Sequence, residues 1–215
     1  MAQQHPPVRV AVAAAAHSLV LQSIRRAMEL GIVVPVLVGR EADIRKEAEA
    51  IGWDLAGADL LPAETGSAAA AAAVDLIKRG KAEILMKGYL HTDEMLRAVL
   101  NQQAGLRTDR LLTHVFVLEV PTYHKLLMIS DAAININPQI AEKAAIAQNA
   151  IDLARRLGVE LPKVAALSSV ETVNPSIPST VHAACLSKMA QRGQIKGAIV
   201  DGPLAFDIAI SADGT

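Results

Sequence analysis

Lys87 and Gly88, which end an apolar stretch of the sequence, could bind a phosphate. Glycine allows a ligand to approach the backbone closely, and lysine supplies a positive charge. A helix predicted to begin at Thr92, with Thr92 as its N-cap, would add free N–H groups nearby. The alternative is an ordinary strand-to-helix turn with a solvated lysine, and the local sequence leaves both interpretations open.

Three arginines follow this junction. Arg97 is predicted on the helix that starts at Thr92, and Arg107 and Arg110 flank the next loop. A guanidinium group is a planar fork that matches a phosphate. Arg107 and Arg110 could instead pair with Asp109, and each arginine taken alone also fits a solvated surface position.

Carboxylates follow two further apolar stretches. Asp131 and its neighbour Asn135 come after the first, where they could bind a ligand or cap a turn with their own side chains. Asp201 and Asp207 come after the second, where they could hold Mg²⁺, act as a base or fix a ligand. Their spacing does not put them on one helical face, so a loop would have to bring them together. Asp201 could equally be a turn residue before Gly202.

The composition favours helices packed on parallel strands. Apolar residues make up 52% of the sequence and aromatic residues only 2%, so the core is predicted to consist of Ala, Val, Ile and Leu. The formal net charge of −1 gives no overall field that would attract nucleic acid or an anionic membrane. A single cysteine, Cys185, excludes an internal disulfide and a cysteine-built metal site.

The sequence carries no signature of a signal peptide, and no apolar run approaches the roughly 18 residues of a membrane span. We therefore predict a cytoplasmic protein with neither a nucleic-acid nor a membrane partner. Dinucleotide-binding, Walker, Gly-x-Ser-x-Gly and His-Glu-x-x-His motifs do not occur in it.

Stretches with strand and helix patterns alternate along the chain, which predicts an α/β fold with a largely parallel sheet. Strands are predicted at residues 8–15, 33–38, 58–61, 83–86, 114–120, 126–130, 163–168 and 198–200. Helices are predicted at residues 17–30, 41–51, 67–78, 92–100, 139–157 and 179–192. Only a turn separates the strands at 114–120 and 126–130, which predicts an antiparallel pair. We place a domain junction there, with domains at residues 1–120 and 121–215.

Five long strings resemble the phosphate acetyltransferase/phosphate butyryltransferase family. The butyryltransferase-like branch, which includes forms fused to an enoyl-CoA hydratase domain, is the most similar. The resemblance covers nearly the whole chain in order. The strings are LMKGYLHTDEMLRAVL, GLRTDRLLTHVFVLEVP, SDAAININPQIAEKAAIAQNAIDLARRLG, PKVAALSSVETVNPSIPST and MAQRGQIKGAIVDGPLAFDIAIS.

The resemblance implies two α/β domains with a cleft between them, like those of isocitrate and isopropylmalate dehydrogenases, usually assembled as a homodimer. It implies transfer of an acetyl or butyryl group between coenzyme A and inorganic phosphate. In the mechanism that the resemblance implies, a base deprotonates the CoA thiol, and arginine holds the phosphate and stabilises the developing charge. The resemblance implies no metal and no organic cofactor, because coenzyme A is a substrate.

The resemblance also assigns site residues. The Thr-x-x-x-Leu-Arg pattern puts Arg97 at a family phosphate-binding arginine. Substrate-binding positions that line the cleft are matched by Lys87, Gly88, Thr92, Asp131, Asn135, Asp201 and Asp207. The family's C-terminal third, with its Ser-Arg-x-x-Asp-type segment, is not among the matching strings, so we expect a C-terminally truncated form of the fold. The catalytic base and serine therefore stay unassigned.

Two other functions remain open. One is a catalytically incomplete protein that binds CoA or an acyl phosphate. The other is a different enzyme on the same scaffold, such as an acyl-carrier-protein phosphate acyltransferase or a dehydrogenase that uses Asp201 and Asp207 for Mg²⁺. No residue can be tied to the acyl pocket, so the sequence does not distinguish acetyl from butyryl transfer.

Overall fold

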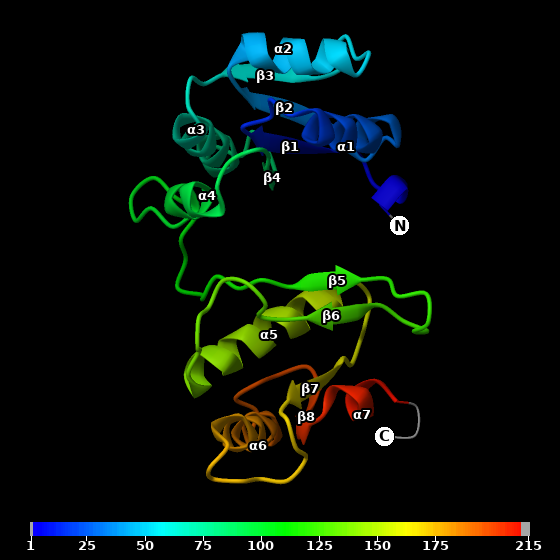
Figure 1. The fold of residues 1–215 in the computed structure, drawn as a ribbon, viewed down its shortest axis with the longest axis vertical. Coiled ribbons are helices and arrows are strands. Elements are labelled where there is room, and N and C mark those ends of the chain that lie inside the picture. Colours follow the sequence, from blue (N-terminus) through cyan, green and yellow to red (C-terminus); the bar gives the residue numbers. More distant parts are fainter. Residues whose placement is uncertain (1, 212–215) are drawn as a thin grey trace. The chain divides into compact units, whose positions relative to one another are not determined.

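The computed structural model describes residues 2–211 and shows an α/β protein in which most strand pairs are parallel (Figure 1). The predicted fold class is therefore confirmed at this level. Contacts divide the chain into two units, Met1–Thr108 and Asp109–Thr215. No helix within residues 2–211 is long and apolar enough to cross a membrane.

The first unit is built on a four-stranded parallel sheet with the strand order β3-β2-β1-β4. Its strands are β1 (Val8–Ala13), β2 (Val33–Gly39), β3 (Asp59–Pro62) and β4 (Ile84–Lys87). Its helices are η1 (Ala2–Gln4), α1 (Ser18–Glu29), α2 (Glu41–Ala50), α3 (Gly66–Lys78) and α4 (Thr92–Val99). The chain adds β2 and β3 on one side of β1 and then returns to place β4 on the other side.

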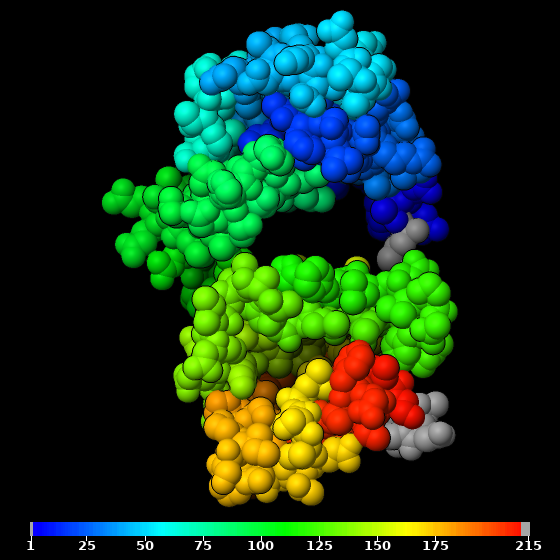
Figure 2. All heavy atoms as spheres, viewed as in Figure 1, coloured from blue at the N-terminus to red at the C-terminus, as the bar shows by residue number. Residues whose placement is uncertain are grey.

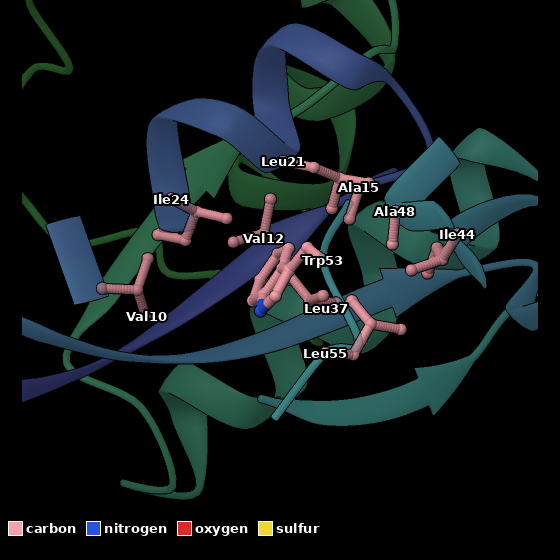
Figure 3. Packing of buried hydrophobic residues seen from close by; sticks show 10 residues of the cluster. All are labelled: Val10, Val12, Ala15, Leu21, Ile24, Leu37, Ile44, Ala48, Trp53 and Leu55. Atoms are coloured by element: carbon pink, nitrogen blue, oxygen red, sulfur yellow. The ribbon is translucent and has the colours of Figure 1, made fainter. Parts of the chain in front are cut away.

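Successive side chains of a strand point to opposite faces of a sheet, and each face of this sheet has its own core. On one face, Val10, Val12 and Leu37 pack against α1 and α2 together with Trp53 (Figure 3). On the other face, neighbouring residues of β1 and β2 pack against α3 and α4. The alanine run of α3 supplies buried small side chains, which lets this helix lie close to the sheet.

The second unit holds two small sheets. The strands β5 (Phe116–Leu118) and β6 (Leu127–Ile129) pair in antiparallel fashion, as predicted. The strands β7 (Lys163–Leu167) and β8 (Ile199–Leu204) pair in parallel, joined by α6 (Pro178–Gln191). The other helices are α5 (Ile140–Arg156) and α7 (Phe206–Ile210). The buried cluster of this unit is small and consists of Ala147, Ile151, Leu186, Ile195 and Val200.

The contacts place both strands of the β5–β6 hairpin in the second unit. A boundary after residue 120 would instead divide the hairpin, because β5 lies before that residue and β6 after it. Backbone hydrogen bonds between paired strands hold them in one unit, so a junction before residue 109 is the division that the packing supports.

Two local predictions were wrong. A turn was expected at Asp201 and Gly202, but β8 continues through them to Leu204 with a register shift against β7. Proline is compatible with a strand at such an irregularity, which is how Pro203 is accommodated. The N-cap of α4 is His91 and not Thr92, because His91 has the extended backbone of a cap and its N–H donates to Oε2 of Glu94, 3.3 Å away.

Candidate functional site

The carboxyl ends of β1 and β4 are held together by backbone hydrogen bonds. The N–H of Gly88 donates to the carbonyl of Ala13, and the N–H of Tyr89 donates to the carbonyl of Ala14, each at 2.8 Å. A Cβ on Gly88 would lie 2.4 Å from the oxygen of Ala14 and 2.5 Å from that of Ala13. Only glycine fits this close approach, so the packing of the backbone explains why glycine follows Lys87. The pair also lies at the carboxyl ends of the strands, which is where open α/β sheets bind ligands and is called the ligand edge below.

An aromatic pair that the sequence did not predict lies at the same edge. The rings of His17 and Tyr89 are stacked, with centroids 4.4 Å apart and an interplanar angle of 19°. Nδ1 of His17 accepts a hydrogen bond from the N–H of Leu19, which makes His17 the N-cap of α1. Lys87, two residues before Tyr89 in the chain, is exposed, with Nζ 3.5 Å from the carbonyl oxygen of Gly88.

The helix α4 carries two more of the predicted residues. The segment of α4 lies at the surface of the first unit (Figure 2). Thr92 is its first residue and is exposed, and 77% of the Arg97 side chain is accessible. The guanidinium of Arg97 pairs with the carboxylate of Asp93, one turn earlier, at 2.6 Å. Exposed pairs of this kind contribute about 0.3–0.5 kcal/mol, so an anion with higher charge can displace Asp93. A shallow depression with Leu96 and Leu100 in its lining adjoins the arginine.

The second unit brings Asp131 and Asn135 into direct contact. The carboxylate of Asp131 accepts from the N–H groups of residues 133, 134 and 135 at 3.2 Å, and from the side-chain amide of Asn135. Burial by itself would raise the pKa of Asp131, but the amide and these N–H groups together hold that pKa below its ordinary value. The same amide of Asn135 donates to the carbonyl of Leu112 at 3.0 Å. The pair therefore fixes this loop, and the carboxylate stays ionised near neutral pH.

Within residues 2–211, no recorded interaction of Asp201 or Asp207 involves Asp131 or Asn135. The carboxylate of Asp201 accepts from the N–H of Gly202 at 2.8 Å, and Asp207 is exposed in the first turn of α7. Within residues 2–211 no cluster of three or more His, Cys, Asp or Glu side chains could hold a metal ion. The Mg²⁺ role considered for Asp201 and Asp207 is therefore not supported by a third side chain of these four types among the described residues.

A further network in the second unit involves Arg110. Its guanidinium donates to Oδ1 of Asn149 at 2.6 Å and to the carboxylate of Asp152 at 2.7 Å. The hydrogen bond from Arg110 is the main reason that the pKa of Asp152 is lowered, with burial opposing it. Pairing of Arg110 with its neighbour Asp109, ligand binding and a solvated surface position were the open expectations, and the structure records partners about forty residues along the chain. Asn149 lies on α5, and nothing in the sequence around it indicates that its side chain binds Arg110.

His114 differs from these satisfied groups. Its ring packs edge-on against Phe116, with centroids 4.4 Å apart, and its Nδ1 is buried without a hydrogen-bond partner in the described part of the chain. The carbonyl of the same residue accepts from Ser130, at 2.7 Å. His114 thus adjoins the Asp131 loop, a placement that its position at the start of a predicted strand did not reveal.

Comparison with known proteins assigns the chain to a family. Residues 62–214, which include every predicted site residue, match the model for phosphate acetyl/butaryl transferase. The chain belongs to the phosphate acetyl/butaryl transferase family. The resemblance predicted from the five strings is thereby confirmed.

Individual relatives agree with this assignment. A phosphate acetyltransferase of Rhizobium meliloti is 50% identical over 187 residues, which are 87% of this chain and 59% of that protein. A phosphate butyryltransferase of Clostridium acetobutylicum is 44% identical over 95% of this chain and 68% of its own length. Among solved structures, a branched-chain phosphotransacylase from Enterococcus faecalis V583 aligns with a TM-score of 0.83 at 28% identity, covering 96% of this chain and 71% of that one. The chain thus spans about three fifths to seven tenths of the length of these family members.

Proposed function

We propose that this chain acts as a phosphate acyltransferase, which moves an acetyl or butyryl group between coenzyme A and inorganic phosphate. The observation that carries the proposal is the family match over residues 62–214, which contains the β4–α4 junction and the four site positions predicted in the second unit. Relatives of comparable identity are named for acetyl and for butyryl transfer. The proposal therefore covers both acetyl and butyryl transfer.

The proposed reaction is a direct transfer. A phosphate oxygen attacks the thioester carbonyl carbon, the new C–O bond forms, and the C–S bond breaks to release the CoA thiolate, which takes up a proton. In the reverse direction the thiolate attacks the acyl phosphate and phosphate leaves. Negative charge builds on the carbonyl oxygen in both directions, and on the departing phosphate in the reverse direction, so a cation positioned beside these oxygens stabilises the transition state. We assign no base, because the Ser-Arg-x-x-Asp-type segment that the family resemblance associates with it is not among the matching strings.

Arg97 is the residue that we propose for binding phosphate. Its guanidinium is exposed, and within residues 2–211 the ion pair recorded for it is the one with Asp93. An incoming phosphate offers more charge and a matching pair of oxygens, so it can replace the carboxylate as the partner of the arginine. Lys87, Gly88 and Thr92 would line the same substrate site from β4 and the start of α4.

The remaining parts of the proposal concern the assembly. We propose that the two units face each other across a cleft, as in isocitrate and isopropylmalate dehydrogenases, with Asp131, Asn135, Asp201 and Asp207 on the side of the second unit. We further propose a homodimer in the cytoplasm that binds neither nucleic acid nor membrane. Acyl-CoA and inorganic phosphate would be its only small-molecule partners, without a metal or organic cofactor.

A second candidate is a protein that binds CoA or an acyl phosphate without turning it over. The small buried cluster of the second unit favours it, because strands such as β5 and β7 leave large apolar side chains exposed. Such a unit holds a site less rigidly than the first unit does, and catalysis is sensitive to small displacements.

The decisive assay is phosphate-dependent release of CoA from acetyl-CoA and from butyryl-CoA, followed with a thiol reagent. Arg97→Ala should lower kcat/KM for phosphate roughly 10- to 150-fold, because a hydrogen bond to a charged group contributes about 1.5–3 kcal/mol. Arg79→Ala is a matched control, since Arg79 is an exposed arginine that pairs with Asp75 one turn earlier at 2.7 Å. It should leave the rate unchanged.

The outcomes separate the two candidates. Release of CoA that needs phosphate or arsenate and is lost in Arg97→Ala supports the acyltransferase. An absence of release from both thioesters, with CoA still bound, contradicts it and favours the binding protein. An equal loss in Arg79→Ala would show that Arg97 acts only through the stability of its helix.

A further inference from the structure

The strand order of the first unit identifies one preferred place for a ligand. In the order β3-β2-β1-β4, the neighbours of β1 are the next strand in the chain on one side and the last strand of the sheet on the other. Helix α1 packs on one face of the sheet, whereas α3 and α4 pack on the opposite face. The loops after β1 and β4 therefore leave in opposite directions. Open α/β sheets bind ligands in the crevice that opens at such a switch point.

The side chains at this switch point are an aromatic pair. His17 follows β1, Tyr89 follows β4, and their rings are stacked. The close approach of Gly88 to the backbone of Ala13 and Ala14 fixes the Tyr89 backbone against the β1–α1 junction. The stack is thus positioned by the sheet itself rather than by a free loop.

Tyr89 is unusual among the few aromatic residues of the chain. The first unit has two aromatic residues, Trp53 and Tyr89. Trp53 is 5% exposed in the core, whereas Tyr89 is 71% exposed at the ligand edge. A ring with one neighbour and most of its surface in solvent can accept a second flat ring, and stacking of a base on an aromatic side chain is favourable for every base.

We propose that Tyr89, backed by His17, is the platform on which the adenine base of coenzyme A stacks. Lys87 lies two residues before Tyr89 in the chain and would supply a positive charge for the phosphates attached to the same nucleoside. This inference rests on the proposed function for the identity of the nucleotide, but the platform can be tested without turnover. The proposed contact between Tyr89 and adenine is separate from the proposed contact between Arg97 and inorganic phosphate.

The test uses the small number of tyrosines. Protein labelled with ¹³C in tyrosine rings should show signals from Tyr89 and Tyr123 alone, assigned with Tyr89→Phe. Titration with adenosine 3′,5′-bisphosphate should shift the Tyr89 ring signals in a saturable way through the ring current of adenine. Tyr123 is a matched internal control, since its ring also adjoins a histidine, His124, with centroids 5.0 Å apart, in the second unit.

Three variants refine the result. Tyr89→Ala should weaken binding of the bisphosphate about 5- to 150-fold, whereas Tyr89→Phe should retain it because the ring face is kept. His17→Asn should keep an N-cap for α1 while removing the ring behind Tyr89, and should weaken binding less than Tyr89→Ala does. Phosphopantetheine, which lacks the base, should bind equally to wild type and Tyr89→Ala.

Failure of the platform is distinct from failure of the proposed function. Tyr89 signals that stay in place while the protein transfers acyl groups would overturn the platform and leave the transferase standing. Tyr89→Ala that loses stability but binds the bisphosphate like wild type would also overturn it, since the stack would then serve only to join two junctions. Saturable shifts of Tyr89 in a protein without acyl transfer would support the platform and contradict the transferase.

Discussion

The close approach at Gly88 leads to a quantitative prediction for Gly88→Ala. The added methyl group would lie 2.4 and 2.5 Å from two backbone oxygens, which cannot rotate away as a side chain could. The β4–α4 junction would have to move outward, which breaks the hydrogen bonds from Gly88 to Ala13 and from Tyr89 to Ala14. The variant should therefore lose both stability and the alignment of the ligand edge.

The size of the loss follows from these contacts. Overpacking costs about 1–3 kcal/mol, and each of the two hydrogen bonds contributes a net 0.5–1.5 kcal/mol, so the free energy of unfolding should fall by roughly 2–6 kcal/mol. Small proteins have only about 5–15 kcal/mol of stability, so the upper end of this range would leave the first unit largely unfolded.

Unfolding of the first unit can be followed in urea through the fluorescence of Trp53, the only tryptophan of the chain. Gly66→Ala is the control, because a Cβ there would meet its nearest neighbours, Glu94 and Leu90, at ordinary distances of 3.4–3.6 Å. This control should unfold like wild type or be more stable by about 0.5 kcal/mol. A Gly88→Ala variant that unfolds within 0.5 kcal/mol (about the error of the method) of wild type would refute the close approach.

Two further predictions concern the second unit. Thr180 is fully buried, and its hydroxyl accepts from the N–H of Asn174 and lies 2.8–2.9 Å from the carbonyl oxygens of Asn174 and Ile177, to which it can donate. Thr180→Val should therefore lower the free energy of unfolding by about 1–3 kcal/mol, measured by denaturation followed by circular dichroism, and Thr180→Ser should lower it less. The folded-state pKa of Asp131 lies below its unfolded value, so its stabilising contribution is present above about pH 4 and is lost as the pH falls through the folded pKa. Asp131→Asn should therefore show a smaller loss of stability than wild type on going from neutral pH to about pH 3, and an unchanged loss would contradict this role.

The elements of the first unit were predictable because their signals are local. The strands β1 and β2 are apolar runs that become buried on both faces, Gly31 at positive φ ends the helix before β2, and Gly39 is the last residue of β2. The Ala-rich helix α3 and its Thr65 cap, which accepts from Ala68 at 3.1 Å, also follow from local chemistry.

The course of β8 was not predictable in the same way. Asp201-Gly202-Pro203 has the composition of a turn, yet the strand continues: Asp201 pairs with Ala165, Leu204 pairs with Leu167, and the register shift between them accommodates Gly202 and Pro203. Whether such a sequence turns or continues depends on the partner strand, and nothing in the local sequence reports that partner.

The candidate site shows the same division. Lys87, Gly88 and the contact between Asp131 and Asn135 lie within a few residues of a strand end, so sequence reasoning could find them. The stack of His17 on Tyr89 joins residues that are far apart in the chain and meet only because β4 returns to the side of β1. Topology, rather than any motif, creates that contact.

The same topology explains why the neighbouring strand end offers less to a ligand. Arg40 follows β2 at the same edge of the sheet, but its guanidinium contacts the carboxylates of Glu64 at 3.3 Å and Asp43 at 3.5 Å. The helices after β1 and β2 pack on one face, so the two loops run the same way and lack the divergence that marks a ligand-binding switch point. At the switch point the loops diverge and Tyr89 stays exposed, so a positive charge and an open ring face coincide only where the strand order reverses among the four strands of the first unit.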